Sequence, residues 1–168
     1  MLITTSATYN SKMCTLKVRG SDPKLARFAQ ESGLRPCVTI EDGLNVSQPS
    51  GRFSSAKSLR EEPGVFGFHV AVSDRGWDDL KGQFSDAVAF VARHHDALLR
   101  LNDLKPDSAT LDFPAKADPS KRHVIIHSID IPVDLSRAAS EVLLAIGITL
   151  YFASRRNDAA NTVVSPEA

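Results

Sequence analysis

Residues 65–102, VFGFHVAVSDRGWDDLKGQFSDAVAFVARHHDALLRLN, predict a buried strand followed by a long amphipathic helix. The strand over 65–72 is almost entirely apolar, as is typical of a central position in a sheet. From Trp77 to Asn102, apolar residues recur at three- and four-residue spacing and form a stripe about 80° wide at 100° per residue, enough to bury one helix face. The stripe consists of Trp77, Leu80, Phe84, Val88, Val91, His95 and Leu98.

The chain before this unit predicts a strand, a short helix and a hairpin. Apolar and polar residues alternate over 13–19, which indicates a half-buried strand. Asp22-Pro23 provides a capping oxygen and a preset φ for a helix start, and Gly33 provides its left-handed end. The hairpin is expected over 37–46, because Asp42-Gly43 suits the two positive-φ positions of a tight turn.

The chain after the long helix predicts three strands and one helix. Strands are expected over 109–113 and 123–131. A helix over 135–146, capped by Asp134 and ended by Gly147, is expected to lead into a last strand over 148–152.

These elements predict an α+β fold: a mostly antiparallel sheet with three helices packed on one face and ferredoxin-like elements at its centre. Adjacent strands without helices between them disfavour a doubly wound parallel sheet. We expect a single α+β domain over 12–153, with flexible tails over 1–11 and 154–168. The face of the sheet opposite the helices is expected to be exposed and free.

Composition excludes several classes of protein. Among 168 residues, 20 Lys and Arg balance 20 Asp and Glu, so no net charge attracts nucleic acid or anionic lipid. No apolar run approaches the roughly 20 residues that a bilayer crossing needs, and the first residues do not resemble a secretory signal, so a cytoplasmic location is expected. Cys14 and Cys37 lack ligand-type neighbours and are expected to be buried free thiols.

The histidines do not predict a metal site. In a strand, His123 and His127 lie about 13 Å apart, too far for bonds of about 2 Å to one ion. His94 and His95 project about 100° apart on a helix. His95 falls on the apolar stripe and is expected to be a neutral structural ring. We therefore expect no metal and no cofactor.

Two small groups of polar residues are candidates for a binding site. His69 and His127 could share the helix-free sheet face with Thr110 and Asp112, although a plain solvent-facing sheet is the competing interpretation. Arg52 lies in a Ser-rich loop over 47–62 whose backbone N–H groups could hold a phosphate or carboxylate. A solvated loop is the competing interpretation there, since the sequence lacks a P-loop motif. The sequence contains neither a GxSxG motif nor a cysteine with an activating base beside it, so these two indications of an enzyme are missing.

The order of signals resembles a family of small bacterial proteins catalogued only as a domain of unknown function. The resemblance spans about residues 14–152. It is carried by Gly20-Ser21-Asp22-Pro23, by Gly33-Leu34-Arg35-Pro36, by the strand Phe66-Gly67-Phe68-His69-Val70 and by the closing segment Pro132–Phe152. This chain has Phe68-His69 where the family usually has a tryptophan and small polar residues. The resemblance implies a free-standing cytoplasmic bacterial α+β protein, without a known activity or site.

The sequence thus favours a non-catalytic binding or protein-interaction module of unknown function, for example of the immunity-protein type. It would meet a protein partner or a second copy through the open sheet face or a strand edge. The alternative is a small-molecule binding protein or minor enzyme with a pocket lined by His69, His127 and Arg52. RNA binding is disfavoured by zero net charge and few aromatic residues.

Overall fold

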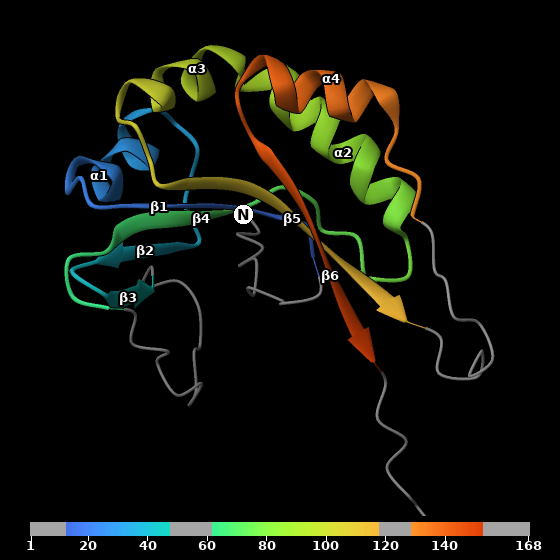
Figure 1. Ribbon diagram of the computed structural model, residues 1–168, viewed down its shortest axis with the longest axis horizontal. Coiled ribbons are helices and arrows are strands. Elements are labelled where there is room, and N and C mark those ends of the chain that lie inside the picture. The colour runs from blue at the N-terminus through green and yellow to red at the C-terminus, as the bar shows by residue number, and fades with distance from the viewer. Residues whose placement is uncertain (1–12, 48–61, 118–128, 153–168) are drawn as a thin grey trace, which may run out of the picture.

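The computed structural model describes residues 13–47, 62–117 and 129–152, which form six strands and four helices. The strands make one sheet in the order β3-β2-β4-β1-β5-β6, and the helices lie together on one side of it (Figure 1). The strands are β1 Thr15–Gly20, β2 Val38–Glu41, β3 Leu44–Ser47, β4 Phe66–Ala71, β5 Ser108–Ala117 and β6 Ala145–Phe152. The helices are α1 Lys24–Glu31, α2 Leu80–Arg93, α3 His95–Asp103 and α4 Val133–Glu141.

The centre of the sheet contains two interleaved β-α-β units. β4 pairs antiparallel with both β1 and β2, and β1 pairs antiparallel with both β4 and β5. In the unit β1-α1-β2, strand β4 of the other unit lies between the two strands. In the unit β4-α2-α3-β5, strand β1 lies between the two strands, which is the ferredoxin-like arrangement. The predicted α+β class and its central elements are confirmed.

The sheet is mixed, because β6 pairs parallel with β5 while the other pairs of described strands are antiparallel. A β-α-β connection through α4 explains this pairing, since parallel neighbours need a crossover. The prediction of a mostly antiparallel sheet did not include this parallel β5–β6 pair.

The prediction of three helices was wrong because the long helix breaks. At His94 the backbone leaves the helical region, with φ −111° and ψ 17°, and α3 starts one residue later. The break changes the helical phase, so the apolar stripe does not continue to His95. The His95 side chain is 41% exposed beside Asp96, and its expected place in the core is corrected.

One apolar core fills the space between the helices and the sheet. Residues that alternate along the three central strands point into it, and the rings of Phe84 and Phe113 meet edge to face with centroids 4.9 Å apart. The strand residues of this core are Leu16 and Val18 from β1, Phe68 and Val70 from β4, and Leu111 and Phe113 from β5. The period-two pattern read from the sequence therefore selects the buried face correctly.

Local signals placed α1 and the first hairpin correctly. Asp22 accepts a hydrogen bond from the Lys24 backbone N–H at 2.8 Å, and Gly33 beyond the helix has φ 77°. Asp42 and Gly43 have φ 50° and 74°, as the tight turn between β2 and β3 requires.

The end of the last helix differs from the prediction. α4 ends at Glu141, where Leu143 takes a φ of 56° and the Leu144 backbone N–H donates to the Ala139 carbonyl at 2.9 Å. Gly147 then lies inside β6 opposite Asp112 and does not end a helix. The apolar residues after Glu141 are compatible with a helix or with a strand, and pairing with β5 makes them a strand.

Other predicted elements lie partly or wholly outside the described residues. Of the strand predicted over 123–131, residues 129–131 are described and are not strand; they lead to Pro132 at the start of α4. The rest of that segment, the loop around Arg52 and the predicted tails fall outside the description. None of the helices in the described part of the chain has the length and apolar composition that a membrane crossing needs.

The helix-free face of the sheet is not uniformly exposed, which corrects the expectation of a free surface. Val38 and Ile40 pair with His69 and Gly67, so their side chains share the face opposite Phe68. They are only 8% and 0% exposed, and Thr15 on the same face is 3% exposed. A broad, solvated docking face is therefore not present over β2 and the start of β1.

Gly67 offers a test of the central pairing. A Cβ at this position would overlap the Val18 carbonyl oxygen across the β1–β4 pair, so Gly67→Ala must push two strands apart. We expect a loss of about 3 kcal/mol, or about 10 °C in Tm, measured by thermal denaturation. Gly76→Ala is the matched control, because its Cβ meets only the flexible Asp78 side chain. Equal stability of the two variants would contradict the register.

Candidate functional site

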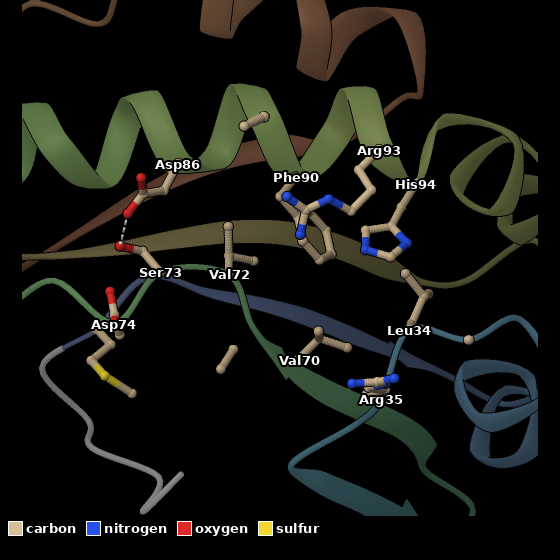
Figure 2. Close-up of a pocket in the computed structure, with 14 residues that line it drawn as sticks. Leu34, Arg35, Val70, Val72, Ser73, Asp74, Asp86, Phe90, Arg93 and His94 are labelled. Atoms are coloured by element: carbon tan, nitrogen blue, oxygen red, sulfur yellow. Dashed lines mark hydrogen bonds between the residues drawn. The ribbon is translucent and has the colours of Figure 1, made fainter. Parts of the chain in front are cut away.

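A cavity of about 760 Å³ opens between α2, the end of β4 and the connection from α1 to β2 (Figure 2). Its volume lies within the range of about 300–1,000 Å³ that is usual for small-molecule sites. It is lined by Met13, Gly33, Leu34, Arg35, Val70, Ala71, Val72, Ser73, Asp74, Asp86, Ala89, Phe90, Arg93 and His94.

The cavity exists because β4 extends beyond β2. β2 begins at Val38, opposite His69, so the following residues of β4 have β1 on one side and no strand on the other. Val70 and Val72 form the floor there, and the connection after Gly33 crosses at the side. The eight-residue α1 ends before this corner, which leaves it without a helical cover.

Helix α2 forms the opposite wall with one continuous face. Asp86, Phe90 and Arg93 lie four and three residues apart, which places them on the same side of a helix. The Phe90 side chain is buried, and its ring centroid lies 4.7 Å from that of His94. His94 follows Phe90 by four residues and its backbone N–H still donates to the Phe90 carbonyl, so helical spacing brings an imidazole to the end of this face.

Two arginines line one end of the cavity. Figure 2 shows Arg93 extending from α2 over Phe90, with His94 beside it, and Arg35 on the α1–β2 connection across the cavity. Arg35 has a φ of 53°, a left-handed conformation that costs a non-glycine residue about 1 kcal/mol or more. Across residues 13–47, 62–117 and 129–152, no carboxylate pairs with either guanidinium.

His94 carries little positive charge at neutral pH. Burial lowers its pKa, and the neighbouring Arg93 cation lowers it further. The ring thus contributes an aromatic surface and one N–H donor, and the two guanidinium groups supply the charge at this end.

Carboxylates line the other end of the cavity. Asp86 Oδ2 accepts hydrogen bonds from Ser73 Oγ at 2.7 Å and from Arg75 Nε at 3.0 Å. Arg75 also pairs with Asp79 at 2.8 Å, and Asp79 caps α2 by accepting from the Gly82 backbone N–H at 3.0 Å. Asp74 is exposed beside this network.

The predicted histidine site is not in the cavity. His69 lies on the helix-free face, where Lys17 is its neighbour across β1 and Thr110 is the neighbour of Lys17 across β5. Lys17 forms an ion pair with Asp112, which also accepts from Thr149 Oγ1 at 2.7 Å. The structure thus places His69, Thr110 and Asp112 on one face, as predicted.

The other predicted site residues, His127 and Arg52, fall outside the described residues, so the proposed grouping with His69 stays a prediction. Burial lowers the pKa of His69 to about 4, and the Arg19 and Lys17 cations contribute to this shift. A neutral ring next to a satisfied ion pair is typical of structural packing in a sheet.

The sequence interpretation missed Arg35 and Arg93 as site residues and considered His94 only as a metal ligand. One signal was available: Asp86, Phe90 and Arg93 follow helical spacing beside the apolar stripe. Their meeting with Arg35 depends on the packing of α2 over β4, for which the sequence has no local signal.

The cysteines do not offer reactive thiolates. Burial raises the pKa of both the Cys14 and the Cys37 thiol, and Asp112 and Asp86 add to the shift at Cys14. Both are free thiols, as predicted, but only Cys14 is buried and Cys37 is half-buried. In the described part of the chain, no group of His, Cys, Asp and Glu side chains is arranged to hold a metal ion.

No protein-family model matches the sequence, and comparisons with curated proteins and with solved structures found no match either. Function must therefore be inferred from the geometry of the chain itself.

The low pKa of His69 makes stability depend on pH. Between the ordinary value of about 6.5 and the folded value of about 4, the unfolded chain binds more protons than the native one, so the free energy of unfolding decreases as pH falls. From pH 7 down to about pH 4, over which the His69 ring becomes charged in the unfolded chain but stays largely neutral in the folded one, the free energy of unfolding falls by about 3 kcal/mol. Urea denaturation of His69→Gln between pH 7 and 4 should show a smaller loss than the unmodified protein.

The exposed His95→Gln variant serves as the control and should keep the full pH dependence. If His69→Gln and His95→Gln lose stability in parallel as pH falls, the protonation of His69 is not linked to folding.

Proposed function

We propose that this chain is a non-catalytic binding protein that holds a small anionic molecule in the cavity between β4 and α2. The observation that carries the proposal is the pair Arg35 and Arg93, which line one cavity without a carboxylate partner among the described residues. A planar guanidinium group can bind a carboxylate or phosphate through two parallel hydrogen bonds. Two such groups beside an apolar floor suit an anion with an apolar body.

The same lining argues for binding without catalysis. Ser73 is the one hydroxyl group among the lining residues, and it donates to Asp86 Oδ2. That oxygen also accepts from Arg75, so the serine belongs to an ion-paired network at the acidic end of the cavity. The alternative considered from the sequence, a pocket lined by arginine and histidine, is therefore favoured, with different residues from those predicted.

Hexanoate is a suitable first probe, because its carboxylate matches the arginines and its apolar chain matches the valine floor and the Phe90 wall. We expect it to raise the Tm of the protein and to bind in isothermal titration calorimetry. Arg93→Gln and Arg35→Gln should each weaken binding about tenfold or more, since a hydrogen bond to a charged group contributes about 1.5–3 kcal/mol.

Arg100→Gln is the matched control, because Arg100 is an exposed arginine on α3 that does not line the cavity. Absence of hexanoate binding, or equal binding by Arg93→Gln and Arg100→Gln, would contradict the proposed site.

A protein partner is the second candidate function, and the edge strand β6 favours it. β6 pairs only with β5 among the described strands, and its eight residues, AIGITLYF, carry no charge. Two antiparallel copies would therefore place no like charges opposite each other. Leu150 is 43% exposed, and Val133 and Leu143 on the flanking α4 region are each 71% exposed. We propose a second copy of this chain as the partner.

Light scattering coupled to size exclusion tests this second candidate at concentrations of tens of micromolar. A charge on an edge strand discourages strand pairing, so Leu150→Lys should convert a dimer to a monomer. Leu99→Lys is the matched control, since Leu99 is 41% exposed on α3. A monomeric unmodified protein, or a dimer unaffected by Leu150→Lys, would exclude pairing through β6.

A further inference from the structure

The cavity has opposite charges at its two ends, and α2 contributes to both. Asp86 and Arg93 lie seven residues apart, which is two helical turns on one face and about 10 Å at 1.5 Å per residue. Figure 2 shows Asp86 with Asp74 toward one end of the cavity, and Arg93 with Arg35 toward the other.

The acidic end keeps an excess of negative charge after its internal ion pairs. Arg75 is the cation that pairs with Asp79 and Asp86, so two carboxylates share one guanidinium. Asp74 adds a third carboxylate, and it has neither an ion pair nor a side-chain hydrogen bond with another described residue. This end therefore suits a cation, as the arginine end suits an anion.

The middle of the cavity is apolar. Val70 is 2% exposed and Phe90 is 8% exposed, and Val72 completes the floor between the charged ends. A polar group in the middle of a ligand would lose water there without gaining a partner, which costs about 1–3 kcal/mol by protein mutational data. The middle of a bound molecule is therefore expected to be apolar.

We infer that the ligand is a zwitterion, with a carboxylate at Arg35 and Arg93, an ammonium at Asp74 and Asp86, and an apolar stretch of about 10 Å between them. A linear amino acid with an amino and a carboxyl group at that separation has an apolar middle and fits both the charged ends and the floor. An extended tripeptide with free termini advances about 3.3–3.6 Å per residue and matches the span, but its two peptide groups would lie unpaired over the apolar middle. This inference rests on the proposed function and adds the acidic end to it.

Calorimetry with 8-aminooctanoate tests the inference, and the tripeptide Ala-Val-Ala, in its free, N-acetylated and C-amidated forms, serves as the second source of the same terminal groups. Capping either terminus should weaken peptide binding about tenfold. Asp74→Asn should weaken binding of the free peptide but not of the N-acetylated form, because the N-acetylated form has no ammonium for Asp74 to bind. Arg93→Gln should weaken binding of the free peptide but not of the C-amidated form, because the C-amidated form has no carboxylate for Arg93 to bind.

Asp103→Asn and Arg100→Gln provide controls on α3, away from the cavity, and should bind the free peptide like the unmodified protein. Binding of 8-aminooctanoate but not of the peptide, with the same dependence on Asp74 and Arg93, supports the zwitterion and identifies a linear amino acid as its source. If hexanoate binds through Arg93 but free and N-acetylated peptides bind equally, the zwitterion is wrong and the proposed function stands. If hexanoate, peptide and 8-aminooctanoate all fail to bind, both are wrong.

Discussion

The burial of one face of β1, β4 and β5 under α2 is the contact on which the rest of the structure depends. Leu16, Phe68 and Leu111 are each fully buried on this face, and Phe84 of α2 packs edge to face on Phe113. Burying side chains of this size contributes about 1.5–3 kcal/mol each, which fixes the register of the three central strands. Since the side-chain period of a strand is two, the same contact also decides which residues face away.

The cavity follows from the limits of this cover. β4 continues beyond the start of β2, while the short α1 ends before the corner that β4 extends into. The floor at Val70, in β4, and at Val72, just beyond its end, is therefore not covered by α1 or β2, and the wall at Phe90 belongs to the main helix. Asp86 and Arg93 lie on α2, whose position the core fixes, whereas Arg35 lies in the connection before β2 and Asp74 in the connection after β4.

The helix-free face shows how far site prediction from the sequence reached. The sequence offered His69, Thr110 and Asp112 as neighbours only as a hypothesis, because it does not reveal strand register, and the observed pairing places the three on one face. The sequence did not predict that Lys17 would join Asp112, or that burial would keep His69 neutral. Both depend on which strands become neighbours, and β1 between β4 and β5 is a long-range choice.

The sequence by itself determined the α+β class, the capped helix before Gly33, the Asp42-Gly43 turn and the buried faces of the strands, because each depends on residues within a few positions of one another. Only the tertiary structure decided where the apolar run after Glu141 becomes a strand, how the main helix breaks at His94, and that Arg35 and Arg93 line one cavity. Those features depend on contacts between residues far apart in the chain, such as the parallel pairing of β5 with β6, and local spacing does not encode them.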